Sequence, residues 1–268
     1  MARDDPITDF EPPSLARLGR WLALPQAWHR PRFSGLENVD PSCPALFVGN
    51  HTLYGVLDVP HLVYELYRVH GIFPRALGDR AHFVVPIWRD LLSGFGCVLG
   101  SRANCEALMR AGQNVLVFPG GAREALKRKG EAYRLIWKDR IGFAQMAAAH
   151  GYPIVPFAAV GAEEAYRIAL DAGEIMASPL GKLLRATGLA DKYLRGGEEL
   201  PPLVRGLGPT WIPRPERFYF SFGEPVATLR YRNSIDDQDA MLALRAKVQA
   251  SIERQLQNLL RLRERERA

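Results

Sequence analysis

The sequence predicts an α/β domain with a central, mostly parallel sheet flanked by helices. From Pro44 onward, short apolar runs alternate with helical patterns, as in sheets whose strands are joined by crossover helices. The 268 residues, 47% of them hydrophobic and 24% charged, are enough for one large core. The stretch after Asp236 begins with acidic residues and ends with arginines, which suits the dipole of a long C-terminal helix.

The N-terminal stretch divides into a tail and an amphipathic helix. Residues 1–13 are acidic and proline-rich, with no basic or apolar region of the kind found in signal peptides. From Ser14 onward, Leu15, Leu18 and Trp21 fall at helical spacing with arginines between them, and Pro25 predicts a break. Such a helix lies in a bilayer interface, packs on the domain, or does both.

The remaining elements follow in order. The predicted strands are 45–50, 97–101, 114–119, 153–160 and 217–223, and the predicted helices are 58–69, 84–94, 103–112, 137–149 and 162–170. Residues 171–215 are rich in Gly and Pro and mix apolar with basic residues, which predicts an insertion forming a lid or a membrane-facing surface. We therefore divide the chain into residues 1–32, a tail and membrane-associating segment, and one domain at 33–268.

Charge and composition narrow the class of protein. The net charge of +6 and the pI near 9.4 favour an anionic partner. We expect an anionic membrane surface and no nucleic acid, because the basic residues are spread out and no nucleic-acid-binding motif occurs. Three cysteines without CxxC spacing predict neither a disulfide framework nor a zinc site. No apolar run reaches the roughly 18 residues of a spanning helix, so we expect a cytoplasmic protein held peripherally on the inner face of a membrane.

The stretch ALFVGNHTLYGVLDVP places Asn50 and His51 where a strand ends, and Asp58 shortly after. A histidine there is a candidate general base; a core histidine, a helix-capping Asn-His pair and half of a metal site are the alternatives. Seven residues along a regular helix span about 10.5 Å, too far for a hydrogen bond between the carboxylate and the imidazole. Pairing of His51 with Asp58 therefore requires a loop between them, which Gly55 would permit.

The stretch NVLVFPGGAREALKRKG predicts a strand, a tight turn at Gly120-Gly121 and a helix. Amide groups at such a turn form a site for an anion or an oxyanion; an ordinary strand–helix turn is the alternative. Arg123 and Glu124 stand in the first helical turn. In a third stretch, GCVLGSR, Arg102 follows a strand end, where parallel sheets collect ligand-binding residues.

These stretches together resemble the PlsC-like glycerolipid acyltransferases. FPGGAR matches the family motif FPEGTR, GCVLGSR matches a glycine–hydrophobic block ending in Arg, and IVPF matches a Val-Pro strand, all in the family's order over residues 33–225. The run around PGGxRE resembles the branch with transmembrane-protein-68-like, diacylglycerol acyltransferase-like and phytyl ester synthase-like enzymes. The resemblance implies that residues 33–268 form an acyltransferase domain.

The resemblance implies transfer of a fatty acyl group from acyl-CoA or acyl-carrier protein to a hydroxyl of a lysophospholipid, glycerolipid or long-chain alcohol. His51 is the implied base and Asp58 fixes its tautomer, with no metal or cofactor. The implied substrate-binding residues are Asn50, Arg102, Gly120, Gly121, Arg123 and Glu124.

Two positions depart from the family pattern. Val56 stands where the family has its Asp, and Gly120 replaces a Glu of the family motif. The second change favours a neutral or differently charged acceptor, with Glu124 as a partial substitute for the missing Glu. A lipid-binding protein without catalysis and a thioesterase-like hydrolase remain alternatives. The oligomeric state and the acyl-chain length stay open.

Overall fold

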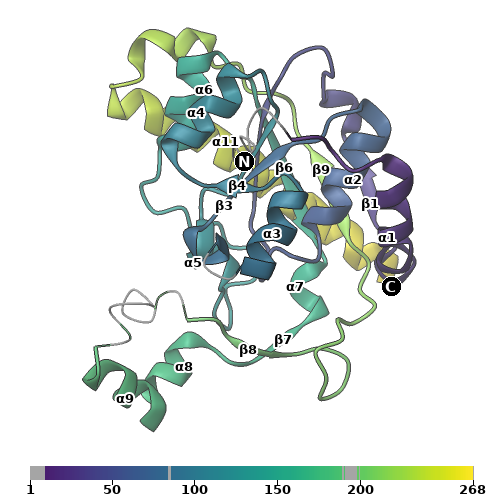
Figure 1. Ribbon diagram of the computed structural model, residues 1–268, viewed down its shortest axis with the longest axis vertical. Helices are drawn as coiled ribbons and strands as arrows, with labels where there is room; N and C mark the ends of the chain where they lie inside the picture. The colour runs from purple at the N-terminus through teal and green to yellow at the C-terminus, as the bar shows by residue number, and fades with distance from the viewer. Residues whose placement is uncertain (1–9, 84–85, 189, 191–197, 199, 268) are drawn as a thin grey trace, which may run out of the picture.

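The computed structural model describes residues 10–83, 86–188, 190, 198 and 200–267, and Figure 1 shows its arrangement. Within those residues, seven strands form one sheet in the order β1-β9-β6-β2-β5-β3-β4. The strands are β1 (Arg32–Ser34), β2 (Leu46–Gly49), β3 (Arg75–Gly78), β4 (Val98–Leu99), β5 (Val115–Val117), β6 (Ile154–Val160) and β9 (Tyr219–Phe222). The five from β4 to β6 are parallel, and β9 and β1 run the other way. The predicted mostly parallel sheet is confirmed.

Helices cover both faces of this sheet. Along β2, Leu46 and Val48 belong to one buried cluster and Phe47 to the other, because successive side chains in a strand point to opposite faces. The first cluster lies under α4 (Arg102–Arg110), α6 (Gly142–His150) and α11 (Gln238–Arg267), and the second under α2 (Val59–His70). Figure 1 shows α11, the predicted C-terminal helix, running behind the sheet.

The N-terminal helix α1 (Leu15–His29) runs through Pro25, so the break predicted there is wrong. Proline inside a helix removes the hydrogen bond to the carbonyl four residues earlier, and that residue here is the solvent-exposed Trp21. Of the predicted tail, residues 1–9 lie outside the described part of the chain, and Phe10 packs on Phe73 with ring centroids 5.6 Å apart.

Two other predicted elements need correction. The helix predicted at 162–170 is α7 (Ala162–Ala165) followed by strand β7 (Arg167–Leu170), because these residues pair with β8 (Leu203–Arg205). The helix predicted from residue 137 begins only at Gly142, since Trp137 turns into the core and Lys138 has a φ of +50°.

The described residues of 167–212, here called the arm, extend away from the body of the domain (Figure 1). Besides β7 and β8, the arm holds α8 (Ala172–Ala177) and α9 (Pro179–Ala186). Parts of the predicted insertion, at 189, 191–197 and 199, lie outside the described residues. Exposed apolar side chains of the arm are Leu170, Leu180, Leu183, Leu203, Leu207, Trp211 and Ile212.

The remaining elements are short. They are the helices α3 (Pro86–Gly94) and α5 (Gly121–Ala125) and the 3₁₀ turns Leu36–Asn38, Arg80–Phe83 and Leu229–Ser234. Across the described part of the chain, every helix is too short or too polar to cross a membrane.

Candidate active site

The loop between β2 and α2 carries His51 at the carboxyl edge of the sheet. Residues 50–58 form neither helix nor strand, and Gly55 has a φ of +61°, so the loop that the spacing requires is present. The imidazole lies against Phe118, with ring centroids 4.4 Å apart. A Cβ at position 55 would come within 2.0 Å of His51 Cε1. Glycine at this position therefore permits the backbone angle and also leaves room for the imidazole.

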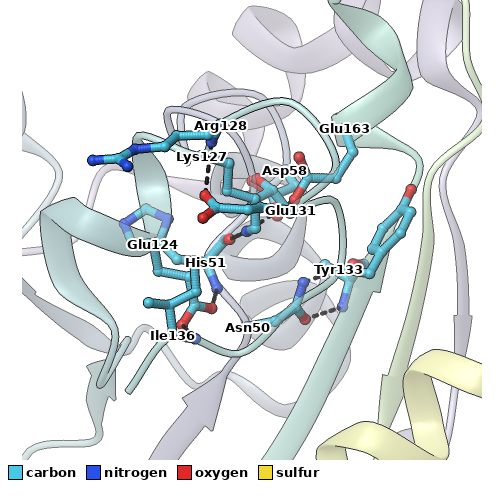
Figure 2. A network of polar contacts seen from close by, with 12 residues as sticks. Asn50, His51, Asp58, Glu124, Lys127, Arg128, Glu131, Tyr133, Ile136 and Glu163 are labelled. Atoms are coloured by element: carbon cyan, nitrogen blue, oxygen red, sulfur yellow. Dashed lines mark hydrogen bonds and ion pairs between the residues drawn. The ribbon is translucent and has the colours of Figure 1, made fainter. Parts of the chain in front are cut away.

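Asp58 is buried at the start of α2, where it bonds to its own loop. Its Oδ1 accepts a hydrogen bond from the Thr52 hydroxyl at 2.9 Å. Burial raises the pKa of the Asp58 carboxyl, and the bond from Thr52 opposes that change. Figure 2 shows the imidazole of His51 directed away from the Asp58 carboxylate. A bond between these two groups stays a prediction, while the observed bond closes the loop that carries His51.

Asn50 joins two strands of the sheet. Its side-chain nitrogen donates to the Ala159 carbonyl at 3.0 Å, and its side-chain oxygen accepts from the Ala159 amide at 2.8 Å. The side chain is completely buried. In this arrangement Asn50 fixes the end of β2 against β6, directly before His51.

The glycine turn after β5 leads into α5. Gly121 has a φ of +53°, and its amide donates to the Phe118 carbonyl at 2.9 Å. A Cβ at position 120 would lie 2.0 Å from Glu124 Oε2. The Gly120–Glu124 pair and a glutamate at position 120 are therefore mutually exclusive ways of building this turn.

Glu124 is buried and holds the main chain of two other segments. Oε1 accepts from the His51 amide at 2.7 Å, and Oε2 accepts from the Ile136 amide at 2.8 Å. Burial raises the pKa of the carboxyl, while the charge of Lys127 and the two amide bonds oppose this. Both oxygens of Glu124 are thus committed to the fold around His51.

Lys127, which no sequence motif singles out, contacts the carbonyl of His51, whereas Glu124 contacts its amide. Its side chain is only 1% exposed. Nζ donates a hydrogen bond to the His51 carbonyl and lies 2.9 Å from Glu163 Oε1 (Figure 2). The run LKRKG is typical of a solvated basic turn, so the burial of Lys127 is not expected from it. The one indication in the sequence is that Lys127 stands three residues after Glu124, a spacing that in a helix places two side chains on the same face.

Of the predicted substrate-binding residues, the two arginines either lie apart from His51 or are already paired with a carboxylate. Arg123 donates from both terminal nitrogens to Glu131, at 2.9 and 2.5 Å. Arg102 is exposed at the start of α4. It follows β4, the third strand along from β2 in the sheet, which corresponds to about 14 Å at usual strand spacing.

A cavity of about 340 Å³ opens beside the imidazole. Its wall combines residues of α1, α2 and α3 with the ends of the strands and is mostly apolar. Lining residues include His51, Trp21, Val63, Leu91, Phe95 and Phe118. Among the described residues, no three His, Cys, Asp or Glu side chains are grouped so as to hold a metal ion.

Comparison with known proteins gives the family and the fold. The profile of the Acyltransferase family matches residues 30–160, which contain His51, Asp58 and the glycine turn. The chain carries a PlsC-like acyltransferase domain. A solved structure, the 1-acyl-sn-glycerophosphate acyltransferase PlsC of Thermotoga maritima, superimposes with a TM-score of 0.51 at 15% identity, over 91% of this chain and 79% of that one. At this identity the likeness shows a shared fold.

Relatives with higher identity are longer proteins. The chain is 32% identical over 228 residues to "Phytyl ester synthase 2, chloroplastic" of Arabidopsis thaliana, covering 81% of this chain and 32% of that protein. It is 30% identical over 147 residues to the human "DGAT1/2-independent enzyme synthesizing storage lipids", covering 55% of this chain and 45% of that protein. The chain thus spans about a third of the plant relative.

Proposed function

We propose that this acyltransferase domain moves a fatty acyl group from a thioester, acyl-CoA or acyl-carrier protein, to a hydroxyl of a lipid-like alcohol. The observation that carries the proposal is the imidazole of His51 at the wall of a mostly apolar cavity. Imidazole exchanges protons near neutral pH, and an apolar cavity is suited to a fatty acyl chain. The family match to the residues that build this edge of the sheet supports the same assignment.

In the proposed reaction His51 takes the proton of the acceptor hydroxyl. The oxygen of that hydroxyl at the same time attacks the carbonyl carbon of the thioester. The tetrahedral intermediate then expels the thiolate, which receives the proton from the imidazolium. The products are an ester and a free thiol, and atoms and charge balance without a covalent enzyme intermediate. Holding the acceptor and the thioester together in a cavity supplies the proximity that such a two-substrate reaction needs.

The glycine turn would stabilise the oxyanion of the intermediate. Because the Gly121 amide already donates to Phe118, this role falls to the amides of Gly120 and Ala122. One well-placed donor of this kind contributes about 3–4 kcal/mol to the transition state.

A neutral acceptor fits the site better than a phosphorylated one. Both terminal nitrogens of the Arg123 guanidinium already bond to Glu131. Arg102 follows β4, which lies three strands from β2 in the sheet. The Glu124 carboxylate takes the space that a side chain at position 120 would need. The names of the relatives, a phytyl ester synthase and an enzyme that synthesises storage lipids, agree with a neutral acceptor. We therefore propose a long-chain alcohol or a neutral glycerolipid.

The substrates would be taken from a membrane surface. Trp21 and Leu24 of α1 are exposed, and the Arg17 guanidinium lies 4.4 Å from the centre of the Trp21 ring. Trp21 also lines the cavity beside His51. An amphipathic helix with arginines and tryptophan suits the interface of an anionic bilayer, so we propose peripheral association with such a membrane.

The test is a transfer assay with the purified protein, a long-chain acyl-CoA or acyl-carrier protein, and either phytol or lysophosphatidate. We expect ester formation with phytol and loss of at least about 1,000-fold in His51→Ala, while circular dichroism and the thermal midpoint show that the variant is folded. Transfer by a folded His51→Ala protein contradicts the proposal. Free fatty acid without ester indicates a hydrolase, and an intact thioester indicates a lipid-binding protein.

A further inference from the structure

The main chain of His51 is held on both its amide and its carbonyl by one short segment. Its amide donates to Glu124 Oε1 at 2.7 Å, and its carbonyl accepts from Lys127 Nζ. Three residues later, the Tyr54 amide donates to the Ala125 carbonyl at 2.8 Å. We call this arrangement of Glu124, Ala125 and Lys127 around the loop the His51 clamp; Figure 2 shows its two side chains.

Lys127 is an unusual member of the clamp because a buried lysine is costly. Its side chain is 1% exposed and that of Glu163, its ion-pair partner at 2.9 Å, is 5% exposed. Removing two charges from water costs about as much as their attraction returns, so the pair by itself does not explain the position. The charge of Lys127 also lowers the pKa values of the buried Asp58, Glu124 and Glu163, which burial raises.

The loop needs such restraint because its backbone is strained. Tyr54 and Gly55 both have a φ of +61°, a conformation that costs a non-glycine residue about 1 kcal/mol or more. Without the bond from Lys127, the loop after His51 loses one restraint. The Cα of His51, which sets the position of the imidazole beside Phe118 and Gly55, then has more room to move.

We propose that Lys127 is a positioning residue for His51, which it holds through the main-chain carbonyl so that the imidazole faces the cavity. This inference rests on the proposed base role of His51. Lys127 does not touch the reacting atoms; it fixes the direction from which the proton is removed. A misplacement of about 1 Å in such a group costs about 100-fold in rate.

The test compares two charge-neutral double variants. Lys127→Met/Glu163→Gln removes the donor to His51 together with its ion-pair partner, so that Glu163 is not left as an unpaired charge. Asp58 and Glu124 lose the nearby charge of Lys127 but keep their hydrogen bonds to Thr52, His51 and Ile136. Glu164→Gln/Arg263→Met is the matched control, since Arg263 lies 2.5 Å from Glu164 in a neighbouring, half-buried ion pair that bonds to Tyr133. We expect both variants to fold with similar thermal midpoints.

Only the Lys127 variant should lose turnover, with kcat lower by about 10- to 100-fold and KM for both substrates within about twofold. Amide hydrogen exchange in residues 51–55 should also be faster by about tenfold than in the control. A folded Lys127→Met/Glu163→Gln protein with the kcat of wild type and His51→Ala inactive beside it overturns the positioning role and leaves the proposed function standing.

The exchange measurement does not depend on turnover. If wild type transfers no acyl group, the proposed function fails, and unchanged exchange in residues 51–55 of the variant still overturns the role of Lys127. Faster exchange confined to that segment supports the restraint of the His51 loop by Lys127, and the kcat of the variant then decides whether this restraint serves catalysis.

Discussion

The His51 clamp buries charged side chains, whereas the arm exposes large apolar ones. In the clamp, Lys127 and Glu124 are buried and each polar atom is matched to a main-chain or charged partner. In the arm, large apolar side chains such as Trp211, 81% exposed, face solvent. Buried polar groups with partners fix one geometry, whereas exposed apolar groups gain free energy only when another surface covers them.

Because of this difference, we expect proton transfer at the clamp and contact with lipid at the arm. The clamp restrains the main chain of His51 to a single position, as a proton-transferring residue requires. The arm has few buried contacts and carries its apolar residues outward, as a surface that meets lipid requires. The two are connected, because the Tyr54 hydroxyl of the loop donates to the Pro202 carbonyl next to β8.

The sharpest way to break the clamp is Gly120→Ala. The added Cβ would lie 2.0 Å from Glu124 Oε2 and 2.4 Å from Glu124 Cβ, so the carboxylate must move. The His51 and Ile136 amides then lose their acceptor, which costs about 2–4 kcal/mol in unfolding free energy, and we expect at least a 100-fold loss of kcat. Urea unfolding and the transfer assay measure the two effects.

Gly142→Ala is the matched control for this substitution. Gly142 begins α6 with a negative φ and open space around its Cβ, so alanine there should leave the transfer rate unchanged and raise stability by up to about 1 kcal/mol. A Gly120→Ala protein as active and stable as Gly142→Ala would show that Glu124 is not needed where it stands.

The sequence predicts the clamp only in part. That His51 and the glycine turn meet follows from the ends of parallel strands lying at one edge, and β2 pairs with β5 in the register Val48–Val117. The bond from Lys127 to Glu163 depends on how β6 and the segment after α5 are placed in three dimensions, and no local pattern encodes that.

The secondary structure of the arm could likewise be predicted only in part from the local sequence. The apolar period of residues 162–170 favours a helix, yet β7 forms because β8 offers hydrogen-bonding partners from a distant part of the chain. Local propensity is a weak guide where long-range pairing decides. The exposure of Trp211 likewise depends on the fold, since the sequence around it mixes apolar residues and prolines without a clear period.

A smaller effect is expected from Asp58→Asn, which probes how the loop is closed. Asparagine still accepts from Thr52, as Asp58 does at 2.9 Å, so if Asp58 acts through the loop we expect about a tenfold loss of kcat. A loss near that of His51→Ala would instead show that the carboxylate meets the imidazole during turnover.

The same variant has a predictable effect on stability. Burial raises the folded-state pKa of Asp58, so its neutral form is favoured in the fold and its contribution is lost as pH rises through that pKa. Asp58→Asn should therefore gain stability relative to wild type between pH 4 and pH 8, as measured by urea unfolding. A constant difference across this range would mean that the Asp58 pKa is not raised by folding.

The smallest effect is expected in the arm, where Trp211→Ser/Ile212→Ser should weaken binding to vesicles of phosphatidylcholine with about one third phosphatidylglycerol. Both side chains are more than half exposed, and removing them costs only part of their burial in lipid, so we expect about a two- to fivefold weaker partition coefficient. Leu229→Ser is the control, because Leu229 is 65% exposed but lies beside Gly151 at the end of α6. Figure 1 shows α6 far from α8 and α9 of the arm. Turnover of a water-soluble substrate, measured without micelles or vesicles, should be the same in the wild type and in both variants, since the clamp is intact. If both variants bind vesicles like wild type, or lose binding equally, the arm has no separate docking role and its exposed apolar residues need another explanation.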